Sequence, residues 1–135
     1  MKIKRYIIGF AIALLLVWII ANVATLPSVK DLKGNFKEVA FYRNQNNTGP
    51  VVRIYAVTLT DTLWKEMKEY GDLMPYTKYG NTKVYFFLSS VPAPKELTPG
   101  KENLSPDLKK YCLAVYEKDA MSVISFQKYP FRNAQ

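Results

Sequence analysis

A chain of 135 residues with a formal net charge of +8 has room for one small domain. Hydrophobic residues make up 49% of it and aromatic residues 14%, a composition that excludes a disordered polar tail. The sequence has no histidine, the commonest metal ligand and general base, and its basic residues form no long run. We therefore expect no metal, no cofactor and no nucleic acid partner.

The first predicted element is a membrane-spanning helix. Residues 6–24 include no charged side chain. A helix of that length is about 28 Å long, close to the roughly 30 Å hydrocarbon core of a bilayer. We therefore expect membrane lipid to surround residues 1–24. The residues expected to lie within the membrane span include Tyr6, Phe10, Leu14, Trp18 and Ala24.

Charge predicts the orientation of this helix. Lys2, Lys4 and Arg5 precede the apolar run, which favours a cytoplasmic N-terminus and a periplasmic or extracellular C-terminal domain. A cleaved signal peptide is the alternative, because it has the same basic start. The apolar run exceeds the usual length of about 7–15 residues and lacks a good cleavage site, which favours a single-pass signal-anchor in the cell membrane. The expected organisation is an anchor over residues 1–24, a linker over 25–35 and an extracytoplasmic domain over 36–135.

Two strands and a helix are predicted next. Residues 36–43 and 51–59 are rich in β-branched and aromatic side chains, and an Asn- and Gly-containing loop separates them. A helix capped by Thr60 or Asp61 is then expected to run to about Tyr70, with Gly71 as a left-handed residue after its end. The apolar side chains of this helix recur at helical spacing, which predicts a face covering a sheet. They are Leu63, Trp64, Met67 and Tyr70.

Three further strands complete the prediction. Residues 83–88 form one strand, and residues 111–118 and 122–129 form a hairpin. Residues 89–106 lie between them and contain four prolines, so this segment is expected to be an irregular loop. The expected fold is α+β, with a mostly antiparallel sheet of about five strands in the order β-β-α-β-β-β and one helix packed on one face.

The last hairpin carries apolar groups on both faces of the sheet. Simple alternation places Cys112, Ala114 and Tyr116 on one face and Leu113 and Val115 on the other. One short helix covers only one face. The second face is therefore expected to be covered by the 89–106 loop, by another subunit, or by nothing.

No catalytic motif is predicted. Ser125 and Lys128 have the spacing of Ser-Lys hydrolases, but they fall in a predicted strand, where positions three apart point to opposite faces. Glu66 and Glu69 lie among lysines on the outer side of the predicted helix, which is typical of a solvated face. A non-enzymatic protein is therefore expected, and an unrecognised Ser-, Lys- or Tyr-based hydrolase is the alternative.

Three residues have two interpretations each. Cys112 is unpaired and is expected to be a small buried strand residue, the alternative being a free or intermolecular thiol. Asn46 and Asn103 each begin a triplet that fits a glycosylation acceptor in a loop, a pattern that is also common by chance.

The expected function is that of a membrane-anchored accessory or binding domain. It would engage a partner protein or ligand through an uncovered sheet face and the 89–106 loop. Tyrosine is abundant near the predicted strands and is favoured both at interfaces and in strands. The alternatives are a secreted small binding or inhibitory protein and a surface subunit of an export or conjugation assembly. The candidate partner surface consists of Tyr85, Tyr111, Leu113, Val115, Val123 and Tyr129.

Overall fold

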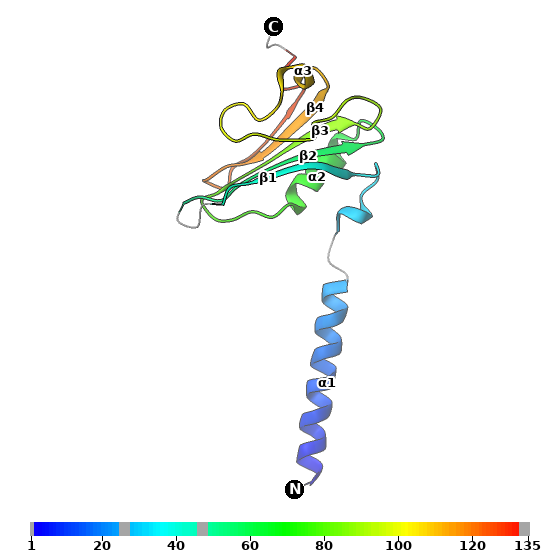
Figure 1. Cartoon of the computed structure of the whole chain (residues 1–135). Helices are drawn as coiled ribbons and strands as arrows, with labels where there is room; N and C mark the ends of the chain where they lie inside the picture. The colour runs from blue at the N-terminus through cyan, green and yellow to red at the C-terminus, as the bar shows by residue number, and fades with distance from the viewer. Residues whose placement is uncertain (1, 25–27, 46–48, 133–135) are drawn as a thin grey trace.

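A computed structural model describes residues 2–24, 28–45 and 49–132 of the chain. The helix α1 (Lys2–Ala24) stands apart from a domain built on one five-stranded sheet (Figure 1). The domain elements in chain order are η1 (Val29–Asp31), β1 (Lys37–Arg43), β2 (Val52–Leu59), α2 (Trp64–Leu73), β3 (Asn81–Leu88), α3 (Pro106–Lys109), β4 (Cys112–Lys118) and β5 (Ile124–Lys128). The predicted α+β class is confirmed, and η1 and α3 are short additions to the predicted order.

The sheet is mixed rather than wholly antiparallel. Its strands lie side by side in chain order, β1-β2-β3-β4-β5. The pairs β1·β2, β3·β4 and β4·β5 are antiparallel, whereas β2 and β3 run parallel. The parallel pair follows from α2, because a helix between two adjacent strands carries the chain back to the end at which it started.

One side of the sheet, which we call the helix face, is covered by α2. Met67 and Tyr70 are buried there, and Leu63 and Trp64 are half-buried against the same cluster. The predicted apolar stripe of this helix is therefore confirmed as its packing face. The buried members of the cluster are Tyr55, Val57, Leu59, Met67, Tyr70, Val84, Phe86, Leu113, Ala114 and Tyr116.

The ends of α2 differ from those predicted. The helix begins at Trp64, with Leu63 as its N-cap residue, and no side chain caps its first turn. At the other end it continues to Leu73, so Gly71 lies inside the helix rather than after it. Gly71 is buried and its φ lies outside the left-handed region, so its role is close packing rather than termination.

The opposite side of the sheet, which we call the loop face, carries a second apolar cluster. Leu97 and Leu104 come from the 89–106 loop and are 8% and 3% exposed, packed over residues of all four strands β1 to β4. Figure 1 shows this loop on the side of the sheet opposite α2. Of the three alternatives expected for the second face, coverage by the 89–106 loop is the one found at the centre of the sheet, so the centre of this face is not the uncovered surface expected to bind a partner. The buried members are Ala40, Ile54, Ala56, Tyr85, Phe87, Leu97, Leu104 and Cys112.

A β-bulge in β4 changes which side chains share a face. Phe86 pairs with Ala114 and Phe87 pairs with Cys112, so Leu113 is the extra residue. Cys112 therefore packs in the loop-face cluster, while Leu113 and Ala114 both pack in the helix-face cluster. The simple alternation predicted for this strand is wrong at its first residues, because a bulge inserts one residue and resets the pattern.

The segment before β1 belongs to the folded domain. Ser28 caps η1 with its side chain, and Val29 and Leu32 pack against the helix-face cluster. The backbone carbonyl of Gly34 accepts hydrogen bonds from the amide and the hydroxyl of Thr60, at 2.8 and 3.1 Å. Most of the predicted 25–35 linker is therefore attached to the domain.

Candidate binding surface

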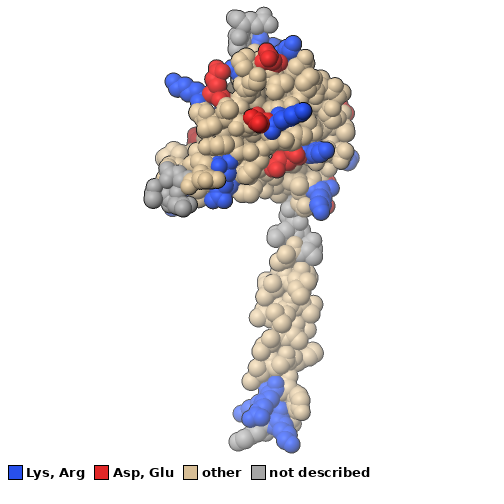
Figure 2. Space-filling model, in the orientation of Figure 1, with Lys and Arg blue, Asp and Glu red and all other residues tan. Residues whose placement is uncertain are grey.

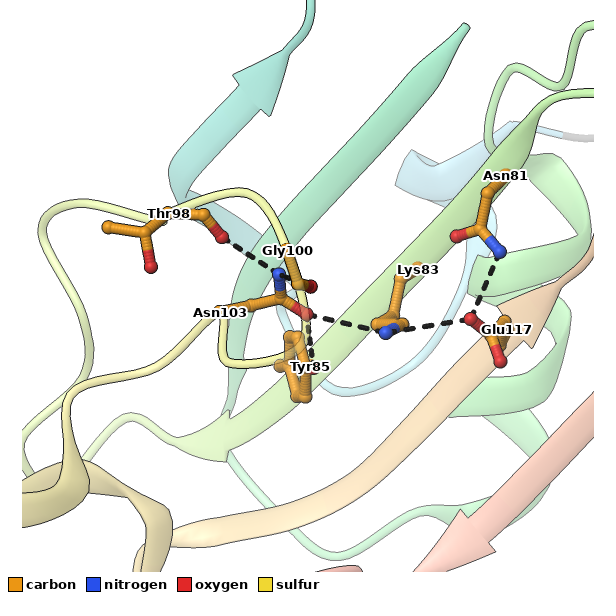
Figure 3. Close-up of polar contacts among 7 residues, drawn as sticks. All are labelled: Asn81, Lys83, Tyr85, Thr98, Gly100, Asn103 and Glu117. Carbon is orange, nitrogen blue, oxygen red and sulfur yellow. Dashed lines mark hydrogen bonds and ion pairs between the residues drawn. The ribbon is translucent and has the colours of Figure 1, made fainter. Parts of the chain in front are cut away.

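A buried asparagine holds the 89–106 loop onto the sheet. Asn103 is 3% exposed, and its Nδ2 donates to the carbonyl oxygens of Thr98 and Gly100 at 2.8 and 3.1 Å. Its Oδ1 accepts from the hydroxyl of Tyr85 at 2.8 Å and from Nζ of Lys83 at 3.3 Å (Figure 3). All four hydrogen-bonding positions of the amide are thus used, which fixes both the loop and the strand side chains beneath it.

A half-buried ion pair continues this network across the sheet. Nζ of Lys83 on β3 lies 3.5 Å from Oε2 of Glu117 on β4, and these side chains are 22% and 33% exposed. Asn81 donates to the same carboxylate oxygen at 3.0 Å (Figure 3). Because both side chains are partly exposed, the ammonium group of Lys83 and the carboxylate of Glu117 each remain accessible to solvent. The pair can therefore offer both a donor and an acceptor to a bound molecule.

Two depressions flank this ion pair on the loop face. One encloses about 280 Å³ and is bounded by Val52, Ile54 and Gly100 in addition to the polar network. The other encloses about 310 Å³ and reaches Ser125, Gln127 and Phe131. Lys83 and Glu117 line both. We call the combined feature the loop-face groove.

Ser125 and Lys128, which have the spacing of Ser-Lys hydrolases, do not meet in the groove. Ser125 lies across from Glu117 in the β4·β5 register and lines the groove. Lys128 instead places its Nζ over the ring of Trp64, 5.0 Å from the centroid, on the helix face. The predicted separation of Ser125 and Lys128 is therefore confirmed. Burial raises the pKa of Tyr85, so its hydroxyl stays protonated at neutral pH and donates that proton to Oδ1 of Asn103.

The six residues of the predicted partner surface do not form one surface. Tyr85 is buried on the loop face and stacks on Phe131, and Leu113 is buried on the helix face. Tyr111 and Val115 are half-buried against the loop-face cluster, and Val115 lines the groove. The remaining two are separate again: Tyr129 packs against Trp64, and Val123 is 58% exposed beyond the end of β4.

The thiol of Cys112 is enclosed. It is 4% exposed, and its Sγ hydrogen-bonds to the carbonyl oxygen of Ala114 at 3.3 Å. Burial raises its pKa to about 12, so the reactive thiolate is rare at neutral pH. The prediction of a small buried strand residue is confirmed. Among the described residues, no group of three His, Cys, Asp or Glu side chains is placed to hold a metal ion.

The two glycosylation triplets have different outcomes. The side chain of Asn103 is buried and donates both of its amide protons to loop carbonyls, so it cannot carry a glycan in this fold. Asn46 lies outside the described residues.

A smaller basic depression lies between α3 and the segment after β5. It encloses about 230 Å³ and is lined by Lys109, Lys110, Arg132 and aromatic side chains. These cations already have partners. Lys109 lies 3.0 Å from a carboxylate oxygen of Glu102, while Lys110 and Arg132 lie over tyrosine rings.

The apolar side chains of α1 point away from any protein contact. Tyr6, Phe10, Leu14 and Trp18 are 56–75% exposed, and Ala24 ends the helix. Figure 2 shows the basic side chains at the end of α1 far from the domain and an uncharged surface along the rest of it. The helix is long and apolar enough to cross a membrane, a property that N-terminal signal sequences share.

Comparisons with known proteins identify no relative of this chain. No protein-family model matches it, and no curated protein or solved structure matches it significantly.

Proposed function

We propose that this chain is a membrane-anchored, non-enzymatic binding protein, with its N-terminus in the cytoplasm and its domain outside. The fully exposed apolar surface of α1 supports the anchor, because such a surface is stable in lipid and not in water. Lys2, Lys4 and Arg5 before the helix support the orientation.

The observation that carries the binding role is the loop-face groove. The centre of the sheet is covered on one face by α2 and on the other by the 89–106 loop. At the groove a cation and a carboxylate stand side by side and line a depression on each side of the pair. A polypeptide segment suits this chemistry, because its amides and polar side chains can accept from Lys83 and donate to Glu117. The proposed partner is therefore a protein.

Photocrosslinking in membranes tests this proposal. A photoreactive amino acid replacing Ser125 would stand at the groove, while one replacing Lys68 would stand on the outer side of α2. We expect one discrete crosslinked partner from position 125 and none from position 68. Equal crosslinking at the two positions would reject the groove as the binding site.

The secreted alternative has a separate test. Sodium carbonate extraction leaves a spanning helix in the membrane fraction. We expect the full-length chain to remain there with its mass unchanged. A soluble species that begins near Thr25 would support a secreted binding or inhibitory protein instead.

A further inference from the structure

The turn between β4 and β5 and the first residue of β5 carry three exposed apolar side chains. Met121 and Val123 are 79% and 58% exposed, and Ile124 at the start of β5 is 44% exposed. Large apolar residues scattered singly over a surface need no explanation, but three within four positions at the tip of a hairpin form a patch.

Hydrogen bonds hold this turn in a fixed shape. One carboxylate oxygen of Asp119 accepts from the amides of Met121 and Val123, at 2.9 and 3.0 Å. The amide of Ser122 donates to the carbonyl oxygen of Asp119 at 2.9 Å, and the hydroxyl of Tyr76 donates to the same carbonyl oxygen at 2.5 Å. The apolar side chains are therefore presented to solvent by a rigid element.

Lysine and tyrosine side chains surround the turn. Lys118 places its Nζ 4.4 Å from the ring centroid of Tyr76. On the neighbouring turn, Lys78 lies 5.1 Å from the ring centroid of Tyr79, which is 63% exposed. An apolar tip with aromatic rings and lysines around it matches the interfacial region of a bilayer, where tyrosine rings and cations meet lipid headgroups. The lysines complement anionic headgroups in charge.

The connection between α1 and the domain is short. The described domain begins at Ser28, which caps η1, and α1 ends at Ala24. The three intervening residues allow a separation of at most about 14 Å between the Cα atoms of Ala24 and Ser28. If α1 spans a membrane, the domain is therefore held against that membrane.

The turn and the tether lie at opposite ends of the strands, because η1 precedes the start of β1 whereas the turn follows the end of β4, beside the start of β3. A domain held close to the membrane can bring the turn to the lipid when its strands lie along the membrane surface. Figure 1 shows η1 between the sheet and α1, and α2 and the 89–106 loop on opposite sides of the sheet. Ile124 points to the same face as Phe126, two positions along β5, and the ring of Phe126 contacts Trp64 of α2. Ile124 of the apolar tip thus lies on the helix face of the sheet.

We propose that the β4–β5 turn inserts Met121, Val123 and Ile124 into the headgroup region of the membrane that holds α1. This second contact orients the domain, so that the helix face lies toward the lipid and the loop-face groove faces away. The inference rests on the membrane anchoring in the proposed function, and its test separates the two.

Site-specific fluorescence on the full-length chain provides the test. The environment-sensitive fluorophore NBD is attached to a cysteine introduced by Val123→Cys, and Lys101→Cys on the 89–106 loop is the matched control. Native Cys112 is buried and stays unlabelled. The chain is reconstituted in vesicles of phosphatidylcholine and phosphatidylglycerol, with and without spin-labelled lipid. We expect a several-fold higher emission at position 123 than at position 101, and quenching by spin-labelled lipid only at position 123.

Three other outcomes would overturn the inference, each in a distinct way. A chain that floats with the vesicles but shows no quenching at position 123 rejects the lipid contact and leaves the anchor intact. Higher emission that rises with protein density and ignores spin-labelled lipid indicates that a second copy covers the tip. A chain that fails to float with the vesicles rejects the anchor and this inference together.

Discussion

Gly71 of α2 lies against the ring of Tyr116 on β4, so closely that a β-carbon at position 71 would overlap the ring atoms. The ring has no room to retreat, because Tyr116 is 1% exposed and its hydroxyl donates to Oδ1 of Asp72 at 2.7 Å. The absence of a side chain at position 71 therefore sets how closely α2 approaches the sheet.

Gly71→Ala should destabilise the domain despite the better helix propensity of alanine. The propensity gain is at most about 1 kcal/mol, whereas overpacking a closed core costs about 1–3 kcal/mol or more. We expect a net loss of about 2 kcal/mol in the free energy of unfolding, measured by urea titration. Lys68→Ala on the exposed side of the same helix is the control and should change stability by less than about 0.5 kcal/mol. A Gly71→Ala protein as stable as the control would show that α2 can move away from Tyr116.

Trp64→Ala should cost less than truncation of a fully buried aromatic residue. Trp64 is only half-buried, between the rings of Phe126 and Tyr129, whereas Phe86 is 0% exposed. We expect a loss of about 2 kcal/mol for Trp64→Ala and about 3–5 kcal/mol for Phe86→Ala, measured as changes in unfolding free energy. Equal losses would mean that the edge formed by α2 and β5 is as tightly packed as the centre of the sheet.

The sequence was sufficient to predict the element order, because strand-forming runs and turn residues alternate clearly along the chain. The sequence also indicates that the sheet is buried on both faces, which an analysis based only on alternating apolar and polar residues does not detect. Residues 51–59 and 83–88 are almost continuously apolar, a pattern typical of strands covered on both sides. These residues form β2 and β3, which lie near the centre of the sheet.

Other features depend on tertiary contacts that local patterns do not encode. The bulge at Leu113 moves Cys112 to the loop face, and no residue type in the segment marks it. The loop covers the sheet through Leu97 and Leu104, two isolated apolar residues in a polar, proline-rich segment. The groove could not be predicted either, because Lys83 and Glu117 become neighbours only through the β3·β4 register.

The domain should lose stability in alkaline solution. Burial raises the pKa of the Cys112 thiol from 9.0 to about 12 and that of the Tyr70 hydroxyl from 10.0 to about 12, and it raises the pKa of Tyr85 and Tyr116 as well. Between the unfolded and folded pKa values, the native state holds protons that the unfolded chain releases. The free energy of unfolding is therefore highest at pH values below the pKa values of the unfolded chain. It falls as the pH rises from the unfolded to the folded pKa of each group, by up to about 1.4 kcal/mol per pH unit for each group.

Urea titrations at pH values from about 8 to about 11 would measure this decline. Cys112→Ala serves as the internal comparison, because it removes the group whose unfolded pKa is lowest. Its stability curve should begin to fall at a higher pH than that of the native chain. A native chain whose stability is unchanged over the whole range would contradict the burial of these hydroxyl and thiol groups.

The last prediction concerns Asn103, the residue that attaches the 89–106 loop. Asn103→Ala removes two donated and two accepted hydrogen bonds and leaves the buried hydroxyl of Tyr85 without this acceptor. We expect a loss of about 2 kcal/mol in unfolding free energy. We also expect faster tryptic cleavage after Lys95 and Lys101, which lie in the same loop and are exposed.

Asn103→Asp should be intermediate in stability and cleavage rate, because it keeps an oxygen for Tyr85 and Lys83 but loses the protons donated to Thr98 and Gly100. Ser90→Ala, at an exposed position of the loop, is the control. If Asn103→Ala matched that control in stability and cleavage rate, the apolar contacts of Leu97 and Leu104 alone would hold the loop, and the polar network would serve only the groove.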